Sequence, residues 1–171
     1  MTTVFTPWPS PIGDLLLVGE VPCDGPGDGP GALRGLYLPG HRRGPAVDPA
    51  WRHDPAAFAR VGAALDAYFA DGAIAFDLPL DLHGSDFQGA VWAALRTIPP
   101  GETVTYAELA RRVGRRGAAR AVGSAVARNP VSIIVPCHRV VGSDGSLTGY
   151  AGGIDRKRWL LAHEREAVAR A

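Results

Sequence analysis

The chain has 171 residues, of which 46% are hydrophobic and 20% charged, so it is long enough for one ordinary domain or two small ones and too apolar for a disordered protein. No basic stretch leads into an apolar run and no long apolar segment occurs, so neither a signal peptide nor a membrane span is expected, and the cytoplasm is the expected location. Its two cysteines, Cys23 and Cys137, lie far apart and are expected to be free thiols.

The net charge of +1 conceals a difference between the two halves of the chain. Residues 1–85 hold five arginines and ten acidic residues, a net charge of −5, whereas residues 86–171 hold thirteen basic and seven acidic residues, a net charge of +6. This asymmetry favours a C-terminal half that faces an anionic partner. Arginines scattered over a solvated surface would explain the same numbers.

The N-terminal part has the pattern of a small sheet. Short stretches rich in branched residues at positions 4–6, 15–18 and 33–38 are predicted to be strands, and the second follows a Pro-Ile-Gly turn. Between the second and third strands, residues 22–31 are rich in Gly, Pro and Asp, which predicts a loop that contains Cys23.

A helix is predicted to follow the third strand. Asp54 and Pro55 are typical of an N-cap and a first helical position, and Asp71-Gly72 ends the pattern. Apolar residues at helical spacing form a stripe that is predicted to face the core: Phe58, Val61, Leu65 and Phe69. Residues 76–84 are predicted to be extended and to join two domains, 1–84 and 85–171.

Helices dominate the second predicted domain. Ser85 and Gln88 form a capping-box pattern that opens a helix through Leu95. Thr105 and Glu108 repeat this pattern before a second helix. A third helix is predicted at residues 117–127, and a last one after residue 155.

The second and third of these helices, joined by a tight turn at residues 114–116, have the proportions of a helix-turn-helix. Residues 118–125 of the third helix combine Arg120 with small side chains, which would let the helix approach the backbone of a nucleic-acid groove closely. Small residues also permit tight packing between helices, so the pattern alone leaves both interpretations open.

Cys137 follows the apolar run 133–135 and therefore is predicted to lie at the end of a buried extended segment. Many lone buried cysteines are only packing residues. Here His138 and Arg139 follow directly, and both could favour the reactive thiolate. Because neighbouring side chains of a strand point to opposite faces, contact between Cys137 and His138 would need a bend or a bridging water, and we expect the water.

Residues 134–141, Ile-Val-Pro-Cys-His-Arg-Val-Val, resemble the active-site signature of the 6-O-alkylguanine-DNA alkyltransferases, also called methylated-DNA–protein-cysteine methyltransferases. The resemblance covers residues 85–165, whereas the N-terminal third is similar only in its pattern of elements. Further blocks that resemble the family, in the family order, are 87–88 with 91–92, 100–106, 118–123, 129–130, 149–153 and 159–164.

The resemblance implies an α/β N-terminal domain, with the small sheet and helix of a ribonuclease-H-like topology, and a mostly α C-terminal winged-helix/helix-turn-helix domain. It implies double-stranded DNA carrying alkylated guanine as the partner, bound in the minor groove, with the damaged nucleotide turned out of the stack. No cofactor is expected, and the scattered spacing of the possible ligands predicts no metal ion that catalysis requires. The sequence carries no oligomer signal, so a monomer is expected, with clustering along DNA left open.

The same resemblance assigns catalytic roles. Cys137 is the nucleophile that takes the alkyl group, a water relays its proton to His138, and Glu164 orients the imidazole. Tyr106 donates a proton or hydrogen bond to the base, although at the start of a helix it could equally pack at the surface. Asn129 braces the active-site turn, or is simply a turn former before Pro130.

It also assigns a substrate pocket and a DNA-binding surface. Arg120 is the candidate that fills the space of the flipped nucleotide, with an ordinary phosphate contact as the alternative. Ala151 stands where some members of the family carry serine, which leaves its backbone N–H but removes a hydroxyl. The other pocket residues are Val140, through its carbonyl, Tyr150 and Trp92; the other DNA-binding residues are Ala119, Ala121, Gly123, Ser124 and Arg128.

Three rival interpretations differ in class. A binding-only relative that recognises damage without repairing it would lack the reactive cysteine, which is present here. A thiol hydrolase with a Cys-His-Glu set would leave the helix-turn-helix unexplained. A zinc site would need closely spaced ligands, and the candidates are scattered: Cys23, His41, His53 and His83.

Overall fold

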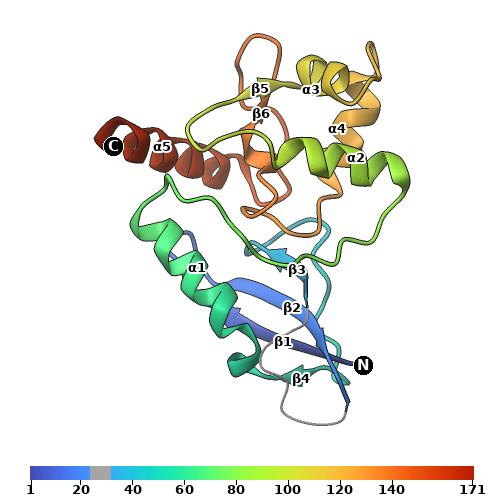
Figure 1. Ribbon diagram of the computed structural model, residues 1–171, viewed down its shortest axis with the longest axis vertical. Helices are drawn as coiled ribbons and strands as arrows, with labels where there is room; N and C mark the ends of the chain where they lie inside the picture. The colour runs from blue at the N-terminus through green and yellow to red at the C-terminus, as the bar shows by residue number, and fades with distance from the viewer. Residues whose placement is uncertain (24–31) are drawn as a thin grey trace.

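A computed structural model describes residues 1–23 and 32–171. The chain is arranged in two halves, with the sheet and helix α1 on one side and helices α2 to α5 on the other (Figure 1). Apart from Pro22 and Cys23, the predicted loop 22–31 lies outside the described residues.

The N-terminal sheet has four strands: β1 (Thr2–Trp8), β2 (Leu15–Val21), β3 (Ala32–Tyr37) and β4 (Arg52–His53). Their order is β3-β2-β1-β4, in which β1, β2 and β3 pair antiparallel and β4 runs parallel to β1. The three predicted strands are therefore confirmed, although β1 and β2 are longer than predicted. β4 is a short, exposed pair of polar residues, and so it gives no apolar alternation from which a strand could be predicted.

The predicted first helix is confirmed and begins with a 3-10 turn. Pro55–Phe58 form the turn, and α1 continues as Ala59–Ala70. The Asp54 carboxylate accepts a hydrogen bond from the Ala57 N–H at 3.2 Å, as its prediction as an N-cap requires. Tyr68, rather than Phe69, is the fully buried aromatic residue of the last turn.

The C-terminal half contains α2 (Asp86–Leu95), α3 (Tyr106–Arg112), α4 (Ala119–Ala127) and α5 (Ile154–Arg170), with a two-stranded parallel sheet, β5 (Val104–Thr105) and β6 (Val140–Val141). Both hydrogen bonds of the predicted capping box join Ser85 and Gln88. Thr105 accepts from the Glu108 N–H, but the Glu108 carboxylate pairs with arginines of its own helix, so only half of the second box forms. Within the described ranges, no helix is long and apolar enough to cross a membrane.

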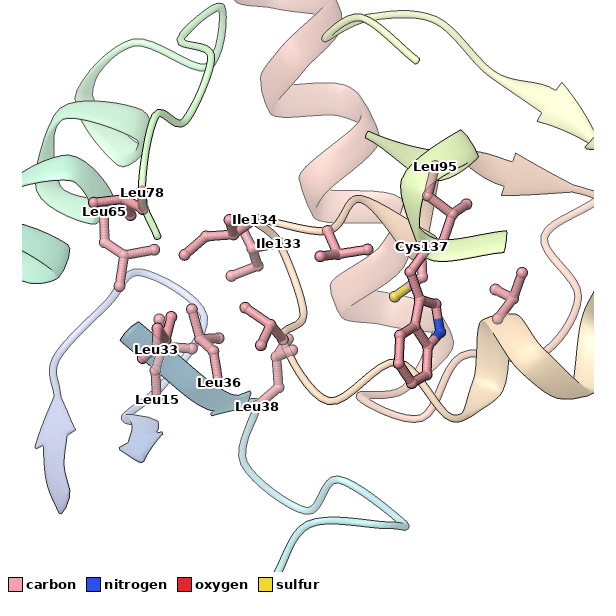
Figure 2. Close-up of a cluster of buried hydrophobic side chains, with 14 of the residues drawn as sticks. Leu15, Leu33, Leu36, Leu38, Leu65, Leu78, Leu95, Ile133, Ile134 and Cys137 are labelled. Atoms are coloured by element: carbon pink, nitrogen blue, oxygen red, sulfur yellow. The ribbon is translucent and has the colours of Figure 1, made fainter. Parts of the chain in front are cut away.

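The segment that precedes Cys137 lies against the edge of the N-terminal sheet. The Leu36 N–H donates to the Pro130 carbonyl at 2.9 Å, and the Ser132 N–H donates to the Leu36 carbonyl at 3.0 Å. Figure 2 shows Ile133 and Ile134 between the leucines of the N-terminal half and Cys137. A continuous hydrophobic core therefore crosses residue 85, where the domain boundary was predicted, and holds the cysteine in place.

Candidate functional site

Cys137 lies at the start of a 3-10 turn, Cys137–Arg139, and not at the end of a strand. The prediction of an extended segment at 133–135 was wrong. Ile133 has a positive φ of 72°, and the backbone bonds of this stretch are local: Ile134 N–H to Ser132 O at 2.8 Å and Val135 N–H to Val131 O at 3.0 Å. A short apolar run shows burial but not backbone conformation, because tight turns can bury the same side chains.

Asn129 spans this turn with its side chain. Its Nδ2 donates to the Val135 carbonyl at 2.8 Å, and its Oδ1 accepts from the Val131 N–H at 3.0 Å. The amide is buried, so both bonds form away from water, where an unpaired polar atom would be costly. Asn129 therefore fixes the backbone that leads to Cys137.

The thiol opens onto a pocket of about 210 Å³. Cys137 is 7% exposed. Helix α4, the start of α3, the loop 149–151 and a segment of the N-terminal half all contribute to the walls. The lining residues are His41, Arg42, Arg43, Tyr106, Gly123, Val126, Ala127, Asn129, Cys137, Gly149, Tyr150 and Ala151.

The surroundings of the thiol hold it protonated at rest. Burial raises the pKa of Cys137, and Asn129, Lys157 and Tyr150 act against that effect only in part. The expectation that Arg139 favours a thiolate was wrong, because its guanidinium is directed to Glu164 and to the Ile98 carbonyl. A base is therefore needed to make this thiol reactive.

His138 is the buried base nearest in sequence. Its Nε2 lies 2.6 Å from Glu164 Oε1, and both side chains are fully buried. An ionised carboxylate can only accept a hydrogen bond, so Nε2 carries the proton and Nδ1 has a lone pair. Nδ1 is buried and has no hydrogen-bond partner among the residues that the structure describes. Burial also lowers the pKa of His138, with Glu164 acting in the opposite direction, which keeps the imidazole neutral.

Glu164 receives five hydrogen bonds. Besides His138, the donors are Arg139 through Nε and NH2 at 2.9 and 2.8 Å, the Tyr68 hydroxyl at 2.8 Å and the Gly101 N–H at 3.2 Å. Burial alone would raise the pKa of this carboxyl, but the hydrogen bonds from His138 and Arg139 and the charge of Arg139 hold the pKa well below its usual range. The carboxylate stays ionised and orients the imidazole.

Lys157, on α5, was not among the predicted site residues. Its Nζ is buried and donates to the carbonyls of Val140 at 2.6 Å, Thr148 at 3.2 Å and Gly149 at 3.4 Å. Burial lowers its pKa to about 8, with the nearby Cys137 acting in the opposite direction. A signal was available in the sequence, since Lys157 is the only lysine beside seventeen arginines.

Tyr106, predicted as catalytic, and Tyr150 and Ala151, predicted for the pocket, all line it. Gly123, predicted as a DNA-binding residue, lines the pocket as well. The Tyr106 hydroxyl donates to the Thr148 carbonyl at 3.3 Å, and burial raises the pKa of this phenol. The Tyr106 ring lies beside Gly123 of α4. The Tyr150 hydroxyl is buried next to the Cys137 thiol, and burial and that neighbour raise its pKa well above the usual value.

Two predicted pocket residues lie elsewhere. The indole of Trp92 is buried and donates from Nε1 to the Ala125 carbonyl at 2.9 Å, so it joins α2 to α4 and does not line the pocket. Val140 is also absent from the lining, and its carbonyl accepts from Lys157. Both residues were predicted for the pocket because they lie in segments that resemble the family. The packing of α2 and α5, which such a resemblance does not give, decides which atoms reach the cavity.

The predicted DNA-binding residues share the outer side of α4. Val122, Ala125 and Val126 are buried, so the helix turns its opposite side outward. Ala119 and Gly123 are partly exposed, and the exposed predicted residues are Arg120, Ala121, Ser124 and Arg128.

The other cysteine is remote from this arrangement. Cys23 is exposed, and its Sγ lies 2.9 Å from the Met1 amino group. Over residues 1–23 and 32–171, no three His, Cys, Asp or Glu side chains are grouped so that they could hold a metal ion.

The buried histidine predicts acid sensitivity. Because the pKa of His138 in the folded protein lies below its ordinary value of 6.5, the unfolded chain binds this proton at a higher pH than the native state does. The free energy of unfolding should therefore fall as the pH is lowered from 7 through that value. Urea unfolding between about pH 5 and 8 measures this; His83→Gln, at an exposed histidine, should keep the same pH dependence. Stability that does not change over this range would contradict a buried neutral His138.

Known proteins resemble this chain in sequence and in fold. Residues 86–166 match the family model described as 6-O-methylguanine DNA methyltransferase, DNA binding domain. The methylated-DNA–protein-cysteine methyltransferase of Mycolicibacterium paratuberculosis is 49% identical over 91% of this chain and 88% of its own. The protein of the same name from Methanosarcina acetivorans is 44% identical over 91% of this chain and 94% of its own.

The similarity extends to solved structures. The crystal structure of Mycobacterium tuberculosis OGT in complex with DNA superposes with a TM-score of 0.81 and 46% identity, over 98% of this chain and 94% of that chain. The chain described here thus belongs to the methylated-DNA–protein-cysteine methyltransferases, a family of DNA alkyl-repair enzymes.

Proposed function

We propose that the protein restores 6-O-alkylguanine, chiefly 6-O-methylguanine, by moving the alkyl group to Sγ of its own Cys137. One observation carries this proposal: the single cysteine on the pocket stands next in sequence to His138, whose imidazole is oriented by a buried, ionised Glu164. This is a nucleophile with a general base and an orienting carboxylate.

The proton of the thiol would go to Nδ1 of His138. No hydrogen bond joins Cys137 and His138 in the part of the chain that the structure describes, and we infer that one water relays the proton between them. Lys157, whose charge lowers the pKa of Cys137, then stabilises the thiolate that forms. The thiolate is made only when it is used, since burial disfavours it at rest.

The transfer forms one bond and breaks one. Sγ attacks the alkyl carbon in line, the bond between that carbon and guanine O6 breaks, and its electron pair goes to the base. The developing charge is neutralised by a proton or hydrogen bond from the Tyr106 hydroxyl, which would leave the Thr148 carbonyl for this purpose. Guanine gains one proton and the thiol loses one: Tyr106 supplies the proton to the base, and the proton held by His138 returns to Tyr106 through solvent. Ala151 lines the pocket, and its backbone N–H is our candidate donor to O6.

The product is a thioether, which water does not cleave under ordinary conditions. The protein would therefore act once per molecule and need neither a cofactor nor a metal ion. We infer a monomer acting on double-stranded DNA.

Access to the lesion requires that the nucleotide leave the stack, because O6 of a paired guanine lies inside the duplex. We propose that α4 enters the minor groove with its small outer residues and that Arg120 occupies the vacated space. The remaining DNA contacts on α4 are Ala119, Ala121, Gly123, Ser124 and Arg128. In this arrangement the pocket is reached from beside α4, since Gly123, Val126 and Ala127 form one of its walls.

Arg120→Ala tests the flipping role. Repair of 6-O-methylguanine in a duplex is expected to slow by about tenfold or more, whereas reaction with the free nucleoside stays within about twofold, because only the duplex has a stack to open. Arg158→Ala, at an exposed arginine of α5, is the matched control. Equal losses on both substrates would reject the flipping role.

The stoichiometry of repair tests the function itself. With duplex in excess over protein, the amount of guanine restored should level off at one per protein molecule and should not increase with further incubation. Continued repair beyond that amount would reject single use, and no repair despite binding would favour a damage-recognition protein.

The fold supports two finer assignments that we also propose. Three antiparallel strands with a fourth parallel to the first are compatible with a ribonuclease-H-like topology of the N-terminal domain, 1–84. The α3–α4 pair next to β5 and β6 is compatible with a winged-helix domain at 85–171.

A further inference from the structure

Two arginines of the N-terminal half differ from the other three. Arg42 and Arg43 are adjacent and exposed, and among the residues described neither has a carboxylate within 4.0 Å. The others are all engaged: Arg34 with Glu20 and Asp81, Arg52 with Asp54, and Arg60 with the Asp77 carbonyl. In a half with a net charge of −5, two unpaired neighbouring arginines indicate a surface kept available for an anion.

These arginines line the cysteine pocket together with His41. The proposed DNA-binding helix, α4, lines the same pocket through Gly123, Val126 and Ala127. Thus a segment that is remote in sequence from the catalytic residues reaches the place where the base would enter.

The segment is held in place by its backbone. The Arg42 N–H donates to the Ala151 carbonyl at 3.1 Å. From α5, Arg156 NH1 bridges the Pro39 carbonyl at 3.0 Å and the Gly152 carbonyl at 3.1 Å. His41 Nδ1 accepts from the Arg43 N–H at 3.1 Å. The two guanidinium groups therefore project from an anchored backbone, which lowers the entropy lost when they bind.

We propose that Arg42 and Arg43 are a second DNA contact, which binds the phosphates of the damaged strand beside the extruded nucleotide. The proposal rests on the proposed function, because it assumes that a nucleotide enters this pocket. Guanidinium groups pair with phosphate oxygens through two parallel N–H bonds, and a base held near Cys137 brings its own flanking phosphates to the pocket mouth. The pair would thus add a contact to the damaged strand beyond those made by α4.

The alternative is that Arg42 and Arg43 only line the pocket and limit the size of the alkyl group that it accepts. The two roles predict different effects on two substrates. Loss of phosphate contacts would slow only the repair of DNA, whereas a change in the pocket lining would also change the reaction with a free nucleoside.

The test is the salt dependence of binding to a duplex with one 6-O-methylguanine, measured in the Cys137→Ser background so that no transfer occurs. With Arg42→Ala/Arg43→Ala, the slope of log affinity against log salt should decrease in magnitude by about one per arginine lost. Arg42→Lys/Arg43→Lys should keep the slope. Arg52→Ala/Arg60→Ala, which removes equal charge from the same half, is the matched control and should leave the slope as it was.

Transfer is then measured with the native cysteine. Arg42→Ala/Arg43→Ala should slow repair of duplex, while the rate with free 6-O-methylguanine nucleoside stays within about twofold of the parent. A salt slope equal to that of the matched control would overturn the proposal, as would equal losses on duplex and nucleoside. Failure of the parent protein to take up any methyl group would instead reject the proposed function, and the salt slope would still decide whether these arginines bind DNA.

Discussion

The Cys137→Ser variant is expected to fold and to bind methylated duplex but to leave the methyl group on guanine. A hydroxyl is smaller than a thiol and fits the same turn, where Asn129 and the neighbouring backbone bonds remain. Serine oxygen is far less acidic and less polarisable than sulfur, so a neutral imidazole does not convert it into a nucleophile for a saturated carbon. Transfer should fall below detection, while the free energy of unfolding changes by no more than about 1–2 kcal/mol.

The transfer activity of this variant is measured as the 6-O-methylguanine that remains in the duplex, determined by chromatography after hydrolysis of the DNA. Cys23→Ser is the control, because its thiol is exposed and lies outside the pocket, and it should repair as the parent does. Repair by Cys137→Ser at a measurable rate would place the nucleophile elsewhere.

Glu164→Gln is expected to damage both the fold and the chemistry. The carboxylate accepts five hydrogen bonds, and glutamine would offer one oxygen and direct an N–H₂ group at donors of His138 or Arg139. Removing one partner of a buried ion pair leaves the guanidinium of Arg139 uncompensated, so the free energy of unfolding should drop by about 3–5 kcal/mol. Transfer should slow by at least about a hundredfold, since His138 loses the group that orients it.

Urea unfolding and single-turnover repair measure the two effects separately. Glu166→Gln, at an exposed position of the same helix, should change the free energy of unfolding by less than about 0.5 kcal/mol and leave the rate intact. Normal stability in Glu164→Gln would contradict the role given to this network.

Local signals in the sequence predicted the elements of the fold well. The helix starts at Asp54 and at Ser85 were predicted from N-cap patterns that span only three or four residues. The N-cap hydrogen bonds that these patterns predict are present. The prediction of an extended segment before Cys137 was wrong, because an apolar run indicates burial but not backbone conformation. Ile133 has a positive φ, which is rare for a β-branched residue and could not be predicted from its side chain. In the second predicted capping box, the Glu108 carboxylate does not bond back to the N-cap, because it pairs with Arg111 and Arg112 of the same helix.

Much of the candidate site could be predicted only because of a resemblance. The residues alone indicated a reactive thiol in a chain with a helix-turn-helix; the family blocks added Glu164, Tyr106, Asn129 and Tyr150. Long-range partners stayed out of reach, since Tyr68 meets Glu164 across 96 positions of sequence. Lys157 and the segment that carries Arg42 were missed for the same reason: only tertiary packing brings them to the pocket.

The most direct measurement is the mass of the intact protein after incubation with a duplex that contains one 6-O-methylguanine, followed by peptide mapping. One methyl group is expected to replace one hydrogen, and it should map to Cys137. An unmodified protein that still binds the lesion, or a methyl group on any other residue, would contradict it.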